Sequence, residues 1–262
     1  MAQQILQIDA FTNVAFKGNP AGVCILAAEP TYQWMQSVAA EMNLAETAFV
    51  LPIAEGYSLR WFTPTVEVDL CGHATIAASH ALWSQGILSE DEKAVFHTLS
   101  GVLTARKDDE WIILDFPSRP AKVHPTPKFL MEGLGIPEQE VLRSDYNYLV
   151  VLNSEEEVVS LEPDFGTLCK VDGFGVIVTA PSKDSRYDFV SRFFVPKVGV
   201  PEDPATGSSH CTLAPFWAQR LGKNPLIGHQ ISSRGGVIRV NVLGDRVELG
   251  GQAITVLEGT LV

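Results

Sequence analysis

The pattern of hydrophobic and polar positions repeats along the chain. Residues 60–68 read RWFTPTVEV and residues 192–200 read RFFVPKVGV, a match without gaps. Farther along, GVLTARKDDEWIILDF from Gly101 matches GVIRVNVLGDRVELGG from Gly236, and each alternating run turns at a polar tip before it returns. Such runs predict paired strands. The matches keep their order and nearly constant spacing, which predicts a duplicated lobe.

Each copy is also expected to contain an early helix, over 31–42 in the first, and a second helix before the paired strands. The second helix, over 73–85, is rich in alanine, and Gly86 follows as its C-cap. Because its side chains are mostly small and apolar on every face, we expect this helix to be buried on all sides inside a shell of strands.

The matching helix of the second copy is expected near 204–221, with Asp203 and Pro204 as its N-cap and first residue. Pro215 should kink or break it. The four prolines of 117–127 indicate a linker between the copies.

Composition restricts the partners. The 262 residues carry a net charge of −12, which argues against nucleic acid and against an acidic membrane surface. The N-terminus has no signal-peptide pattern, and no apolar run is long enough to span a membrane. The four scattered cysteines are interpreted as reduced thiols, so a cytoplasmic protein is expected.

Small, polar turns precede the two central helices, DLCGHAT at 69–75 and EDPATGSSH at 202–210. Each would present backbone N–H groups and the positive end of a helix dipole. If a pseudo-twofold axis brings them face to face, they form a cleft between the lobes that suits a carboxylate and an enolate-like intermediate. The alternative is that these glycines only allow tight packing.

Glu46 is the strongest candidate for a catalytic base. It enters the apolar run NLAETAFVLP, and burial raises the pKa of a carboxyl group towards the range of a base working near neutrality. The second copy has no acid in this register. A solvent-facing strand start is the alternative for Glu46, and a core or capping role is the alternative for His73.

Other chemistries lack their signatures. GxGxxG, a Walker loop, HExxH and GxSxG are absent, and His73 and His80 are too widely spaced for a helical metal pair. We therefore expect no cofactor and no metal.

Four stretches together resemble the phenazine-biosynthesis (PhzF-like) family of the diaminopimelate epimerase fold: IDAFTNVAFKGNPAGV (8–23), NLAETAFV (43–50), RWFTPTVEVDLCGHAT (60–75) and GVPEDPATGSS (199–209). The resemblance implies an α/β (α+β) protein of two pseudo-symmetric lobes, each a mixed β-barrel around a central helix. The lobes would span 1–118 and 119–262, with the option that the last strand crosses back to the first lobe.

By motif, the resemblance places the proton-shuttling glutamate at Glu46 and accompanying catalytic residues at His73, Asp203 and Ser208. Substrate would be held by Asn19, Gly72 and Gly207, and the family is usually homodimeric.

The chain departs from the true epimerases, which use one cysteine before each central helix. Here Cys71 fills the first register but Pro204 the second, which disfavours a two-cysteine racemisation. The sequence thus predicts a cofactor-independent isomerase that moves a proton on a small carboxylate-bearing metabolite. A lyase (dehydratase) using the same proton abstraction and a non-catalytic small-molecule-binding protein stay open as alternatives.

Overall fold

A computed structural model describes residues 3–262, which form two compact units. The first unit takes in the chain up to Asp115 together with Gly250–Val262, and the second runs from Phe116 to Leu249. Within residues 3–262, no helix combines the length and apolar character needed to cross a membrane.

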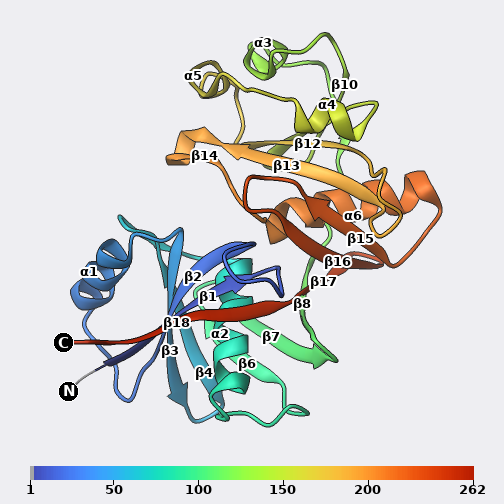
Figure 1. Cartoon of the computed structure of the whole chain (residues 1–262). Helices are drawn as coiled ribbons and strands as arrows, with labels where there is room; N and C mark the ends of the chain where they lie inside the picture. The colour runs from blue at the N-terminus through green and yellow to red at the C-terminus, as the bar shows by residue number, and fades with distance from the viewer. Residues whose placement is uncertain (1–2) are drawn as a thin grey trace. The chain divides into compact units, whose positions relative to one another are not determined.

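The first unit consists of strands and two helices, with the last strand of the chain beside the first (Figure 1). Its elements are β1 (Gln3–Ala10), β2 (Asn19–Ile25), α1 (Tyr32–Met42), β3 (Glu46–Ile53), β4 (Gly56–Phe62), β5 (Glu67–Val68), α2 (Gly72–Ser84), β6 (Ala94–Thr98), β7 (Gly101–Asp108), most of β8 (Trp111–Pro117), and β18 (Ala253–Leu261). The last strand pairs antiparallel with β1 along its whole length, so the chain ends in the unit in which it begins.

Helix α2 is the centre of this unit. It packs against β1, β2, β3 and β18, and every residue from His73 to Trp83 except His80 is buried. Alanines on several of its faces let the strands approach the helix backbone closely, and Gly86 follows the C-cap with a left-handed φ of 68°. The expectation of a central helix without a polar face is confirmed.

The second unit contains the same kinds of element plus three short helices (Figure 1). In chain order they are β9 (Lys122–Val123), α3 (Leu130–Leu134), β10 (Glu140–Arg143), β11 (Asn147–Val151), α4 (Glu155–Val159), α5 (Phe165–Leu168), β12 (Gly175–Pro181), β13 (Phe189–Val195), the 3₁₀ turn η1 (Pro196–Val198), β14 (Val200–Glu202), α6 (Gly207–Leu221), β15 (Leu226–Gln230), β16 (Gly236–Leu243) and β17 (Arg246–Gly251). Helix α4 packs on β12 and β13, and α3 packs on α5, within one apolar cluster that includes Leu130, Val158 and Phe194.

Strand pairing follows one plan in the two units. The parallel pair β2–β3 corresponds to β11–β12, and the parallel pair β4–β6 corresponds to β13–β15. The matched segments lie in like elements, because 60–68 covers the end of β4 and β5 while 192–200 covers the end of β13 and the start of β14. The duplication predicted from the sequence is therefore confirmed, and each central helix follows the equivalent short strand.

The start of the second central helix differs from the expectation. Helix α6 begins at Gly207 with Thr206 as its N-cap, so Asp203 and Pro204 lie in the preceding turn and not in the helix. Glu202 pairs with Phe194 as Glu67 pairs with Phe62, and four residues then lead to each helix, 203–206 before α6 and 68–71 before α2. The structural equivalent of Cys71 is thus Thr206 rather than Pro204, and the N-cap of α6 is not a cysteine.

Pro215 does not break α6, which continues to Leu221. A proline at this position removes the helical hydrogen bond to the carbonyl of Cys211, four residues earlier. The backbone N–H of Arg119 donates to that carbonyl at 2.9 Å instead. Of the expected kink or break, the break is wrong, and a residue of the proline-rich linker replaces the lost donor.

His210 gives the second unit a pH-dependent stability. Its side chain is fully buried in α6, and its Nδ1–H donates to the carbonyl of Thr206 at 2.7 Å. Burial lowers the pKa of His210 to about 4. Unfolded histidine binds a proton near pH 6.5, so protons favour the unfolded chain between pH 6.5 and 4, and stability falls as the pH falls through this range.

We expect His210 to account for a loss of about 2 kcal/mol in unfolding free energy between pH 7 and pH 5. Urea unfolding of the wild type and of His210→Gln at both pH values measures this, because glutamine keeps a donor for Thr206 but does not titrate. Equal pH dependence of the two proteins would contradict the assignment.

Candidate active site

Glu46 is the first residue of β3 and pairs with Ala21 in the parallel neighbour β2. Asn19 begins β2 and is fully buried, so both candidate residues lie at the start of adjacent strands. Parallel strands start at the same edge of a sheet, which brings the two positions together. The Glu46 side chain is 19% exposed, so it is largely enclosed yet accessible from solvent.

The loop before Asn19 is held in an unusual conformation. Phe11, Phe16 and Gly18 all have a left-handed backbone, with φ of 63°, 68° and 64°. The buried carboxylate of Asp9 accepts a hydrogen bond from the Phe16 N–H at 2.7 Å, which holds the loop in place. A side chain at Gly18 would lie 2.1 Å from the Ala10 carbonyl oxygen, so glycine is required there.

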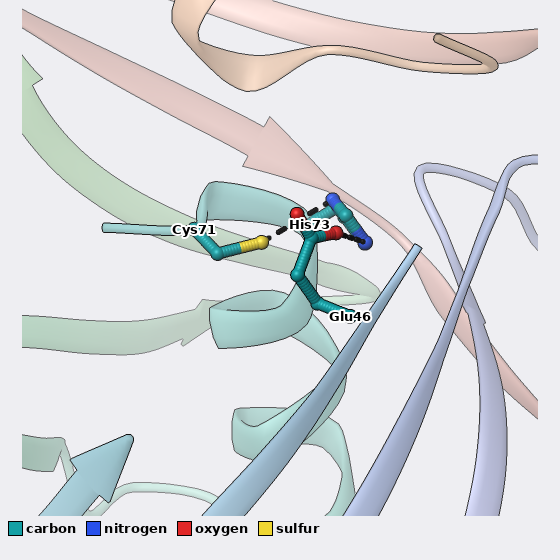
Figure 2. Close-up of side chains that lie close together, drawn as sticks. All are labelled: Glu46, Cys71 and His73. Atoms are coloured by element: carbon teal, nitrogen blue, oxygen red, sulfur yellow. Dashed lines mark hydrogen bonds and ion pairs between the residues drawn. The ribbon is translucent and has the colours of Figure 1, made fainter. Parts of the chain in front are cut away.

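Two further side chains meet Glu46 from the start of α2 (Figure 2). The His73 Nε2 lies 3.2 Å from the Glu46 Oε2, and the His73 Nδ1 lies 3.5 Å from the Cys71 Sγ. His73 and Cys71 are each 7% exposed. The structure therefore brings together two predicted site residues, Glu46 and His73, and adds Cys71, which the sequence analysis placed in the register of an epimerase cysteine but not among the site residues.

His73 is a neutral imidazole at physiological pH. Burial lowers the pKa of His73 to about 4. A neutral ring has one N–H donor and one acceptor nitrogen. The Cys71 thiol can donate to Nδ1, which leaves the proton of the neutral ring on Nε2, 3.2 Å from the Glu46 carboxylate. In this arrangement His73 lies against the carboxylate without neutralising it.

The backbone N–H groups in the first turn of α2 receive no capping hydrogen bond from the N-cap side chain. Cys71 is the N-cap, and its side chain makes no capping hydrogen bond. The first N–H groups of a helix have no partner within the helix, and they carry the positive end of its dipole. Gly72, the first residue of α2, is partly exposed and has no side chain to cover these donors.

The remaining predicted residues, Asp203, Gly207 and Ser208, belong to the second unit. Asp203 lies in the turn before α6, where the Thr206 hydroxyl donates to its carboxylate. The buried Gln230 holds this turn, because its Nε2 donates to the Asp203 carbonyl at 2.7 Å and its Oε1 accepts from the Thr206 N–H at 2.9 Å. Gly207 and Ser208 are the first two residues of α6, the former buried and the latter exposed.

The sequence analysis missed a duplicated ion pair that holds each short strand. Arg60 donates to both carboxylate oxygens of Glu67 at 2.7 and 2.8 Å, which ties β4 to β5 just before α2. Arg192 makes the same bidentate pair with Glu202 at 2.8 and 2.9 Å, and it also donates to the carbonyls of two residues outside the strand. The recurrence of the two arginines at matched positions was the available signal.

Comparisons with known proteins agree with this geometry. The model of a family described as phenazine biosynthesis-like protein matches residues 8–259. A protein of Halalkalibacterium halodurans named as an uncharacterized isomerase is 51% identical over 262 residues, which cover 100% of this chain and 99% of the relative.

Solved structures show the same fold. The crystal structure of a phenazine biosynthesis protein of the PhzF family from Enterococcus faecalis covers 100% of both chains with a TM-score of 0.96 and 39% identity. A hydroxyproline epimerase from Agrobacterium vitis, solved with bound trans-4-hydroxy-L-proline, has a TM-score of 0.63 and 12% identity and covers 99% of this chain and 92% of its own. At that identity, the epimerase supports the fold alone.

Arg60 and Arg192 allow a matched test of how much each ion pair before a central helix contributes to stability. We expect Arg60→Lys to lower the unfolding free energy by about 1 to 2 kcal/mol, because lysine cannot form the bidentate pair. Arg192→Lys should cost about 3 to 4 kcal/mol, since Arg192 also donates to the carbonyls of Val158 and Leu161. Urea unfolding of the two variants measures both, and an equal or reversed order would show that these carbonyl bonds contribute little.

Proposed function

Because the chain belongs to the phenazine biosynthesis-like protein family, we propose that it is an isomerase that moves a proton on a small carboxylate-bearing metabolite without a cofactor. The names of relatives such as the Halalkalibacterium protein support an isomerase. The observation that carries the proposal is the 3.2 Å contact between the Glu46 carboxylate and the buried, neutral His73 at the start of α2.

Glu46 is the proposed acid and base. Its carboxylate takes a proton from a carbon of the substrate, and the electron pair of the broken C–H bond moves towards the substrate carboxylate as an enolate. The carboxylic acid of Glu46 then returns the proton to a different carbon of the same molecule, which restores the ionised Glu46. A single group that is carboxylate and acid in turn requires a partner that holds it without neutralising it, and neutral His73 meets this condition.

The start of α2 is the proposed site for the charge of the substrate. Its backbone N–H groups and dipole favour an anion, and they become more favourable as charge develops on an enolate in an enclosed site. Gly72 leaves room for a carboxylate to reach these donors, and Asn19 lies at the start of the neighbouring strand. For Asp203, Gly207 and Ser208 we propose the roles that the motif resemblance implies.

The central test is Glu46→Gln, which keeps the size of the side chain and removes the proton acceptor. We expect a folded protein that still binds substrate and loses turnover by at least about 100-fold, the lower range for general acid–base catalysis. Screening small carboxylic acids for deuterium incorporation in heavy water by NMR identifies a substrate for the wild type and supplies the assay.

Glu41→Gln is the matched control, since Glu41 is exposed on α1 and the change removes the same charge. It should turn over like wild type. Equal turnover of Glu46→Gln and wild type would remove Glu46 as the base. A product that has lost water would assign the same proton abstraction to a lyase.

Cys71→Ser separates this mechanism from cysteine chemistry. Serine can also donate to the His73 Nδ1, and a hydrogen bond contributes about 1 kcal/mol, so the variant should lose less than about 10-fold in turnover. Circular dichroism must first show a folded protein, because Cys71 is buried. A folded but inactive variant would indicate that the thiol itself transfers the proton.

A further inference from the structure

Glu46, Cys71 and His73 combine three different donor atoms in one place. The side chains offer a carboxylate oxygen, a thiol sulfur and an imidazole nitrogen, and these atoms lie within 4.8 Å of one another (Figure 2). They come from the start of β3 and the start of α2, two elements of one unit that pack against each other. Their relative positions are therefore set by the core of that unit.

The spacing of two of the three donors fits a tetrahedral cation. Zinc bonds of about 2.3 Å to sulfur and about 2.0 Å to nitrogen or oxygen place tetrahedral ligands about 3.5 Å apart for a sulfur–nitrogen pair and about 3.3 Å for a nitrogen–oxygen pair. The Cys71 Sγ lies 3.5 Å from the His73 Nδ1, so these two already have the required separation. The Glu46 carboxylate lies on the other side of the ring, 3.2 Å from Nε2, so a cation on Nδ1 requires the Glu46 side chain to change rotamer and swing towards Nδ1, which a partly exposed side chain at the start of a strand allows.

The chemistry of the donors selects the cation. Thiolate and imidazole ligands suit zinc and disfavour magnesium and calcium, which prefer oxygen. On binding, Cys71 loses its thiol proton to solvent, and the thiolate and the Glu46 carboxylate together balance two positive charges. A histidine ring binds a metal ion through the lone pair of one ring nitrogen.

We propose that Glu46, Cys71 and His73 form a binding site for one zinc-like divalent cation, with a fourth position open to water or to a substrate carboxylate. The cation binds the Glu46 carboxylate, which then cannot accept a proton from the substrate, so the cation acts as a reversible inhibitor. The inhibition rests on the proposed function, whereas the binding does not.

Cobalt(II) titration of the metal-free protein tests the binding directly. Cobalt(II) takes tetrahedral sulfur and nitrogen ligands and gives a sulfur-to-cobalt charge-transfer band. We expect this band to saturate at one equivalent and to be displaced by zinc but not by magnesium. Loss of an outer partner of a ligand already weakens metal binding about 10- to 100-fold, so Cys71→Ser should remove the band and weaken zinc binding by at least about 100-fold.

The other cysteines are the matched controls. Cys211→Ser changes a buried cysteine in α6, and Cys169→Ser changes an exposed one, so both should keep the band and the affinity. If Cys71→Ser does not fold, Glu46→Gln provides the second variant and should weaken zinc binding by about 10-fold or more. Absence of the band in the wild type, or its loss in Cys169→Ser, overturns the site.

Activity provides a separate readout. Zinc should inhibit wild-type turnover in proportion to the occupancy given by the cobalt titration, and a chelator should restore it. A protein that binds cobalt through Cys71 but turns over equally with and without zinc would keep the metal site and contradict Glu46 as the base. A protein without measurable turnover would leave the cobalt result standing by itself.

Discussion

The burial of α2 among the strands of the first unit fixes the geometry of the candidate site. A helix without a polar face can be packed only from all sides, and its small residues let β1, β2, β3 and β18 approach its backbone. Burial of the helix also removes its freedom to rotate or slide. Its first turn therefore stays next to the start of β3, and the contact between Glu46 and His73 follows from the packing of the core.

The two units show how a duplicated plan supports different chemistry. Both retain the bidentate arginine–glutamate pair that ties the short strand to its neighbour before the central helix. Beyond that pair they differ in residue type and not in length, because four residues lead from Glu67 to α2 and four lead from Glu202 to α6. The first turn ends at Cys71, whereas the second ends at Thr206 and is held from within by Gln230. The shared pair stabilises the approach to each helix, and the residues of the turn differ.

The sequence predicted the fold well because periodic patterns determine strands, helices and their repetition. The match of 60–68 with 192–200 correctly placed like elements, and the alanine-rich pattern correctly predicted a fully buried helix. The predicted start of α6 was wrong because the ungapped match aligned Val68 with Val200, whereas the strand pairing aligns Glu67 with Glu202. The three added residues lie in the irregular segment between Phe194 and Glu202, which has no periodicity to reveal them.

The local arrangement of the site was predictable only in part. Glu46 and His73 could be named from motifs, yet their approach depends on the parallel pairing of β2 with β3 and on the position of α2 between strands. The contact of Cys71 with His73 depends on an N-cap side chain that does not cap its own helix, which the residue type does not reveal. The outcome at Pro215 depends on a donor from Arg119, which is distant in sequence.

The Arg119 N–H gives the proline-rich segment between the two copies a structural role in the second unit. A proline within a helix leaves one carbonyl without its usual partner, and the linker supplies the missing N–H, so the linker is part of the second unit's hydrogen-bond network and not only a tether. The neighbouring Ser118 N–H adds a second attachment, to the carbonyl of Asp245. A fragment of the second unit that started after Arg119 would thus expose an unsatisfied carbonyl inside its central helix. The natural limit for separating the two units lies before this segment.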